Sequence, residues 1–125
     1  MAFLASLFTQ GLAAVKLAAL ISSAQIGPGT TFWANGDPSN PDPRNACHLR
    51  VKGIPKRLDD RAMAFAHKTL PCGSWAIIYN PRTGRSVLAQ KWDWGPRHAL
   101  IDMTRAVTKA IGSDGEETVV VFPIK

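Results

Sequence analysis

The sequence predicts a mainly β domain with one short packed helix, and three observations support this. The 125 residues, 46% of them hydrophobic, suffice for one core but not for two. Nine prolines and ten glycines fall between the apolar runs, as expected for a protein with many turns. The runs themselves are short and rich in β-branched and aromatic residues, which is typical of strands. We therefore expect one folded domain over residues 27–125, preceded by a separate segment.

Residues 1–26 form that segment, which is rich in Ala, Leu and Phe and carries Lys16 as its only charged side chain. On a helix its apolar side chains would share one face and its polar side chains the other. Three roles stay open for such an amphipathic helix. The first is packing on a partner or joining copies of the chain. The second is an export signal with a cleavage site at Ser22-Ser23-Ala24, and the third is an anchor on a membrane surface.

The strands are predicted in chain order from the turn signals between them. Gly27-Pro28-Gly29 indicates a break, and Thr30–Ala34 is predicted as the first strand because β-branched and aromatic residues dominate it. The proline-rich stretch 35–45 is predicted as a surface loop. Further short strands are predicted at Ala62–Ala66, Trp75–Tyr79, Ser86–Lys91 and Thr118–Phe122.

One hairpin and one helix complete the predicted elements. Asn80–Gly84 has a proline just inside the turn and a glycine at its end, so the strands on either side should be antiparallel neighbours. Apolar residues recur at helical spacing over 103–111, which predicts a helix that Gly112 ends. Either Asp102 or Thr104 is expected to cap its start.

Cys47 and Cys72 are the two cysteines of the chain, and neither lies in a zinc-ligand spacing. We therefore expect no metal site, and no cofactor is implied. In an oxidising compartment the pair would form a disulfide worth about 3 kcal/mol, whereas in the cytosol it would remain two small buried thiols.

The formal charge of +6 favours polyanionic partners, among them nucleic acid, teichoic acid and anionic peptidoglycan. The basic residues are scattered along the chain and no standard recognition motif is present. Nucleic acid is therefore not expected as a partner.

Four sequence blocks occur in order, namely Ala66–Gly73, Asn80–Val87, Asp93–Pro96 and Ile101–Ala106. They resemble the signature of rare lipoprotein A, which reads Ala-His-Lys-Thr-Leu-Pro-x-Gly, Asn-x-x-x-Gly-Arg-Ser-Val, Asn-Asp-Arg-Gly-Pro and Ile-Asp-Leu-Ser-x-Ala. The earlier stretches 31–33 and 46–47 are similar to the opening of an expansin domain. The resemblance implies a six-stranded double-psi β-barrel whose crossing loops bring the His and Asp blocks to one open groove for a glycan strand.

The resemblance also implies a chemistry, because in the bacterial family this groove cleaves peptidoglycan as a lytic transglycosylase. His67 and Asp93 match the family's His and Asp, and Asp102 matches a carboxylate of expansins and related endoglucanases. Cleavage needs a protonated acid at the leaving oxygen, while the sugar's own hydroxyl attacks in place of water. Trp92 and Trp94 flank Asp93, where they would shield the acid from water and stack on a sugar, and His67 would orient the acid or exchange its proton.

The sequence departs from the family at two positions. Lys56 stands where the family has an acidic residue, so Asp59 or Asp60 is the nearest substitute, and Trp94 replaces the family's Arg. Asp59 and Arg97 join the two tryptophans as candidate substrate-binding residues.

Structural roles compete with the functional ones for several of these residues. Asp102 fits a helix cap, and His67 fits a hydrogen-bonded structural histidine. Trp33 and Trp75 are expected in the core rather than on a sugar-binding surface.

Taken together, the sequence predicts a domain that engages cell-wall glycan, with peptidoglycan or another wall polysaccharide as the partner. One hypothesis is cleavage with Asp93 as the acid or base, and the alternative is a non-catalytic glycan-binding module. A third is a structural part of a larger assembly, such as a bacteriophage tail, or a homo-oligomer held through residues 1–26. The corresponding locations are the periplasm or cell envelope, or the virion.

Overall fold

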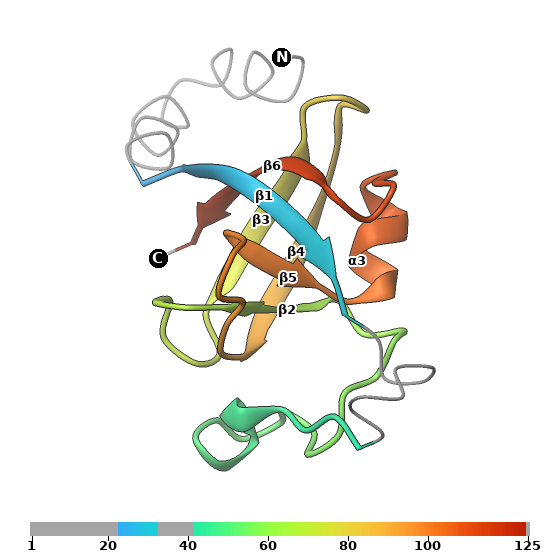
Figure 1. The fold of residues 1–125 in the computed structure, drawn as a ribbon. Coiled ribbons are helices and arrows are strands. Elements are labelled where there is room, and N and C mark those ends of the chain that lie inside the picture. The colour runs from blue at the N-terminus through green and yellow to red at the C-terminus, as the bar shows by residue number, and fades with distance from the viewer. Residues whose placement is uncertain (1–22, 33–41, 125) are drawn as a thin grey trace.

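The computed structural model describes residues 23–32 and 42–124, which form six strands and two short helices (Figure 1). In chain order the elements are β1 (Gln25–Thr31), the 3-10 helix η1 (Ala46–Leu49), β2 (Ala64–His67), β3 (Trp75–Asn80), β4 (Arg85–Asp93), β5 (Ile101–Met103), α3 (Arg105–Ala110) and β6 (Glu117–Pro123). Most of the predicted amino-terminal helix, most of the loop 35–45, and Trp33 lie outside the described residues. Within the described part, no helix is both long enough and apolar enough to cross a membrane.

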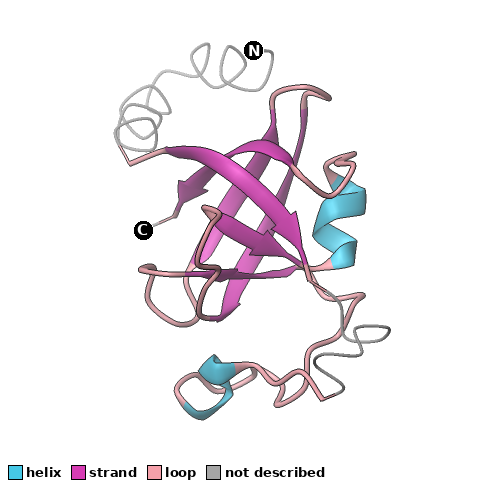
Figure 2. Cartoon of the chain, in the orientation of Figure 1, coloured by secondary structure: helices cyan, strands magenta, loops and turns pink. Residues whose placement is uncertain are grey.

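The six strands close into a barrel in the order β1-β5-β2-β4-β3-β6, with α3 packed outside it (Figure 2). β1 pairs in parallel with β5, and β2 in parallel with β4. The other neighbouring strands pair antiparallel. Closure gives every strand two partners and so removes exposed sheet edges. The predicted six-stranded barrel with one short packed helix is confirmed, and its topology brings β4 and β5 to either side of β2.

Alternating side chains of the strands fill the barrel, because successive residues of a strand point to opposite faces. Phe65, Ile78 and Met103 are fully buried there, and Val107 and Ile111 from the α3 region pack against the same core. This alternation also decides which side chains of β2, β4 and β5 remain outside.

β1 begins at Gln25, which corrects the prediction of a break at 27–29 and a first strand starting at Thr30. A Cβ at Gly29 would lie 2.9 Å from Cγ2 of Val119, so the glycine allows the backbones to approach closely instead of ending the strand. Pro28 has no amide hydrogen to donate, but its carbonyl accepts a hydrogen bond of 2.9 Å from the amide of Leu100.

Thr104 caps α3, and this corrects the suggestion that Asp102 is mainly a helix cap. The Thr104 Oγ1 accepts a hydrogen bond of 3.3 Å from the amide of Val107. Asp102 lies instead in β5, a strand of three residues that is too short to show a period in the sequence. Gly112, with φ of +65°, follows the helix as predicted.

β3 and β4 form the predicted antiparallel hairpin, and the Gly84 amide closes its turn by donating to the Asn80 carbonyl at 2.8 Å. Trp75 opens β3 and is 46% exposed, so the prediction that it lies in the core is wrong. The reason is alternation, because the next residue, Ala76, faces the core.

Candidate functional site

Four side chains form a row across the outside of the barrel, and we call them the acidic row: Thr30, Asp102, Ala66 and Asp93. Thr30 of β1 pairs with Asp102 of β5, Asp102 with Ala66 of β2, and Ala66 with Asp93 of β4. Their chain neighbours Phe65, Ile101 and Met103 point into the core, so the row points outward. The small Ala66 side chain thus separates two carboxyl groups that come from distant parts of the sequence.

A register shift in β4 places Asp93 in this row. Phe65 pairs with Lys91 and the next residue, Ala66, pairs with Asp93, so Trp92 is the extra residue of a β-bulge. A bulge turns two consecutive side chains toward one face. Trp92 and Asp93 therefore both lie on the outer face of β4.

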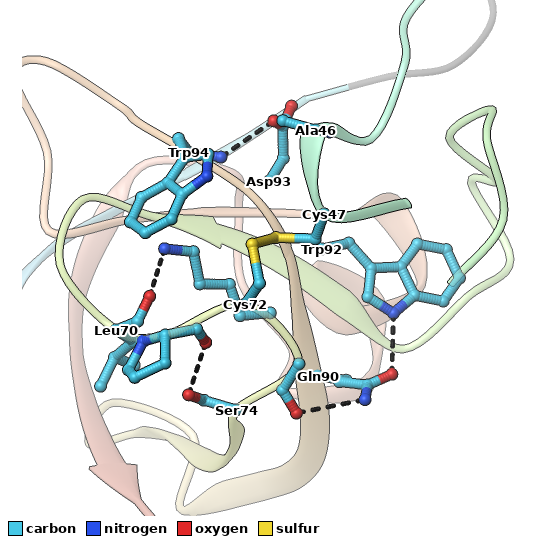
Figure 3. Close-up of a disulfide and its surroundings, with 12 residues drawn as sticks. Ala46, Cys47, Leu70, Cys72, Ser74, Gln90, Trp92, Asp93 and Trp94 are labelled. Atoms are coloured by element: carbon cyan, nitrogen blue, oxygen red, sulfur yellow. Dashed lines mark hydrogen bonds between the residues drawn. A yellow bond between two sulfur atoms is a disulfide. The ribbon is translucent and has the colours of Figure 1, made fainter. Parts of the chain in front are cut away.

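The Asp93 carboxylate is held by two backbone amides. Its Oδ1 accepts hydrogen bonds from Trp94 at 2.9 Å and from Ala46 at 3.2 Å (Figure 3). The two flanking indoles lie on different sides of it, and the Trp92 Nε1 donates to Gln90 at 3.0 Å. The predicted roles of the two rings, shielding Asp93 from water and stacking on a sugar, stay predictions.

Asp102 is the more enclosed carboxyl of the row. Burial raises its pKa, the hydrogen bond from Thr30 Oγ1 at 2.8 Å opposes this shift, and the nearby charge of Asp93 raises the pKa further. Loss of water penalises the charged form of an acid, and a second carboxylate does the same. Asp102 is thus the carboxyl that holds a proton more readily than an ordinary aspartic acid.

His67 lies on the opposite side of β2 from Ala66 and is only 3% exposed. Its Nδ1 accepts hydrogen bonds from the amides of Thr69 and Leu70, both at 3.1 Å, so its Nε2 carries the proton and donates to Gln25 Oε1 at 2.7 Å. Burial lowers its pKa, and the charges of Lys91 and Lys68 lower the pKa further. The expectation that His67 and Asp93 face each other across an open groove is therefore corrected: both ring nitrogens are engaged inside the protein.

Lys91 is a functional candidate that the sequence analysis did not select. Its side chain is fully buried, its Nζ donates to the Leu70 carbonyl, and the same nitrogen lies 2.9 Å from the centre of the Trp94 ring. Burial lowers its pKa to about 8, while Asp93 acts in the opposite direction. The sequence did contain a signal for Lys91. It lies two residues after Ala89, which faces the core, so strand alternation predicts a lysine that points inward, and a buried lysine is rare.

The structure joins Cys47 and Cys72 in a disulfide with a Cα–Cα distance of 5.4 Å. The bond ties η1 to the loop between β2 and β3, and it lies next to the Ala46 amide that contacts Asp93 (Figure 3). Asn45 closes the η1 loop from the other side, donating through Nδ2 to the carbonyls of Pro55 and Arg57 at 2.9 and 3.0 Å. The loop is thereby fastened beside the acidic row.

The remaining sequence candidates lie around this surface. Asp59 accepts from the Arg61 amide at 2.9 Å, which lowers its pKa and fits a turn residue better than a proton donor. Asp59 and Trp92 line one hollow of about 560 Å³. Arg97 is exposed, and its carbonyl accepts from Lys68 Nζ at 2.7 Å. A second hollow lies beside α3 and includes none of the acidic row.

Metal ligation finds no support in the described residues, which hold no group of three or more His, Cys, Asp or Glu side chains able to share an ion. The chemistry that this surface offers is that of two carboxyls and neighbouring indoles.

No protein-family model matches the sequence. The chain is similar to the endolytic peptidoglycan transglycosylase RlpA of Neisseria meningitidis serogroups A and B, with 36% identity over 67 residues, 52% of this chain and 28% of those proteins. It is also similar to the probable endolytic peptidoglycan transglycosylase RlpA of a Nostoc species, with 36% identity over 62 residues, 48% of this chain and 17% of that protein. The chain thus spans less than a third of the length of these relatives.

Among solved structures, the fold is similar to that of cerato-platanin 3 from M. perniciosa. The TM-score is 0.57 at 13% identity, over 81% of this chain and 95% of that one. These similarities confirm the resemblance found in the four sequence blocks, and the barrel has the double-psi fold.

Proposed function

We propose that this domain binds a peptidoglycan glycan strand across the acidic row and cleaves it there. The observation that carries the proposal is the placement of Asp102 and Asp93 in register on either side of Ala66, on the outer face of the barrel. The similarity to proteins named as peptidoglycan transglycosylases supports peptidoglycan as the polymer. The disulfide supports an oxidising, extracytoplasmic location.

Asp102 of β5 is the proton donor in this proposal and Asp93 of β4 is its partner, so the acid role predicted for Asp93 moves to Asp102. A glycosidic oxygen leaves easily only when it is protonated, so the donor must retain its proton near neutral pH. Burial raises the pKa of Asp102, which is the direction that this role needs. In this proposal the Asp93 carboxylate, which accepts hydrogen bonds from two amides, stabilises the positive charge that develops on the sugar ring.

The step balances without an added reagent. The Asp102 carboxyl proton moves to the bridging oxygen as the bond from the anomeric carbon to that oxygen breaks. A hydroxyl of the same sugar then bonds to the anomeric carbon, and its proton passes to the Asp93 or Asp102 carboxylate, giving an anhydro sugar. Proton exchange with solvent restores the starting state.

Purified sacculi test this function directly. The wild-type protein should release anhydromuropeptides, and Asp102→Asn should lower that rate by about 10²- to 10⁴-fold, the usual contribution of a general acid. Asp93→Asn should also lower it, whereas Glu116→Gln, at an exposed carboxylate outside the row, should not. Full activity in Asp102→Asn would remove Asp102 from the mechanism.

A non-catalytic glycan-binding domain is the second candidate. It is favoured by two observations: Lys56 stands where the related family has an acid, and His67 has no free ring nitrogen. In that case sacculi would retain the protein in a pull-down assay while releasing no anhydromuropeptides.

A role in a bacteriophage tail or in a homo-oligomer stays a prediction. Both ideas rest on residues 1–26, which lie almost entirely outside the described part of the chain, and the similar proteins lend them no support.

A further inference from the structure

We propose that the outer face of β3 and its two neighbouring strands is a docking surface for the amino-terminal segment, residues 1–22 of the same chain. This inference goes beyond the proposed function, because the surface shares only β4 with the acidic row. It is built from contacts of the described residues and from the sequence of the segment, which itself lies outside them.

Five apolar side chains lie together on this surface. Ile77 of β3 pairs with Leu88 of β4 on one side and with Phe122 of β6 on the other. The residues next to these three along each strand belong to the core, so the three side chains point outward. Trp75 opens β3, and its carbonyl accepts a hydrogen bond of 2.9 Å from the amide of Ile124. We call Trp75, Ile77, Leu88, Phe122 and Ile124 the apolar face.

The apolar face is uncharged and partly open to water. Trp75, Leu88 and Ile124 are between 41% and 50% exposed. The stretches 75–79, 86–90 and 118–124 contain no charged residue. Single exposed apolar side chains are ordinary, but a contiguous uncharged group of them marks an interaction surface. Because every strand of the described barrel already has two partners, the occupant must contact side chains and cannot add a strand.

The chain enters the barrel beside this face. Ala24 packs against the cluster of Tyr79, Val120 and Phe122, and β1 then runs alongside β6. β6 in turn lies between β1 and β3 (Figure 1). Residues 1–22 are therefore attached directly next to the apolar face. So short a link gives the segment an effective concentration on the order of mM, which favours it over a second copy of the chain as the occupant.

The sequence of the segment matches the surface in character. On a helix its apolar side chains would share one face, among them Leu4, Leu7, Phe8, Leu12 and Val15. Such a helix would be about 33 Å long, whereas three neighbouring strands are about 10 Å across, so it is long enough to cross the apolar face. Contact between the two would remove apolar area from water on both sides without burying a charge.

Trypsin cleavage after Lys16 tests this docking on the full chain, because Lys16 is the only Lys or Arg before Arg44. The cut requires the segment to be detached, so the cleavage rate follows the detached fraction. Leu88→Glu puts a charge into the contact and should raise that rate by about tenfold. Leu49→Glu is the matched control, since Leu49 is exposed but lies in η1, and it should leave the rate unchanged. Mass spectrometry follows the loss of residues 1–16.

Variants in the segment supply the other half of the test. Leu7→Glu, on the predicted apolar side, should also raise the cleavage rate by about tenfold, whereas Gln10→Glu, on the polar side, should not. The double variant Leu7→Glu/Leu88→Glu should be cleaved about as fast as either single variant, because both changes disrupt one contact. Circular dichroism shows whether each variant is folded.

The remaining outcomes would overturn the inference. These are equal cleavage rates in the wild type, Leu7→Glu and Leu88→Glu, or effects of the two changes that multiply in the double variant. A wild-type rate constant that falls as the protein concentration rises would assign the apolar face to a second copy of the chain. A difference between wild type and Leu88→Glu that appears only with phosphatidylglycerol vesicles would place the segment on a membrane surface. None of these results depends on sacculus cleavage, so the inference and the proposed function can fail separately.

Discussion

The two faces of the sheet formed by β4, β2 and β5 carry ionisable groups whose pKa values respond to burial in opposite ways. On the outer face, burial raises the pKa of Asp102 on β5. On the inner side, burial lowers the pKa of His67 and of Lys91, so both give up a proton more easily. The cause is one and the same, because a low-dielectric surrounding penalises whichever form is charged.

Residues that are neighbours in a sequence motif can therefore face different sides of the barrel. Ala66 and His67 are consecutive in one block, yet strand alternation sends them to opposite faces. His67 then serves the structure by holding two amides and Gln25, while the outer face joins carboxyls from β4 and β5. Stability and chemistry are thus separable by mutation.

The largest expected effect is a loss of stability when His67, on the inner face of β2, is replaced. His67→Ala leaves the Thr69 and Leu70 amides and Gln25 without their partner, so the free energy of unfolding should fall by about 3 kcal/mol. Denaturant titration measures this, with the exposed His98→Ala as the control. A His67→Ala protein of unchanged stability that no longer cleaves sacculi would contradict the structural role.

A smaller, pH-dependent effect is expected from Lys91. Its pKa is about 8 when folded but about 10.4 when unfolded, so between these values the unfolded chain binds more protons. The wild-type stability should therefore rise with pH across this window, by at most about 1.4 kcal/mol per pH unit, relative to Lys91→Met. Unfolding curves of both proteins from pH 7 to pH 10 test this, and parallel pH dependence in the two would show that Lys91 is not the source.

The smallest effect sharpens the assignment on the outer face. Thr30→Val removes the hydroxyl that holds down the pKa of Asp102, so that pKa should rise. A general acid is active only while protonated, so the alkaline limb of the pH–rate profile for sacculus cleavage should move to higher pH in Thr30→Val. A limb that stays in place would mean that a group other than Asp102 donates the proton.

Much of the fold followed from local sequence signals. The β3–β4 hairpin, the strand in 118–122 and the end of the helix at Gly112 are each encoded by neighbouring residues, through turn chemistry and alternation. β5 was not visible in this way, because three residues gain their strand conformation only by pairing with β1 and β2.

The candidate residues for chemistry could be chosen from the sequence, since the four motif blocks contain Asp93, Asp102 and His67. Which of them lie together depends on the pairing of distant strands. Parallel pairing of β2 with β4 and antiparallel pairing with β5 fix the acidic row, and a one-residue bulge sets the direction of Asp93. These strand pairings join positions that are far apart in the chain. Strand register determines whether a side chain faces water or the core, and no local sequence pattern specifies that register.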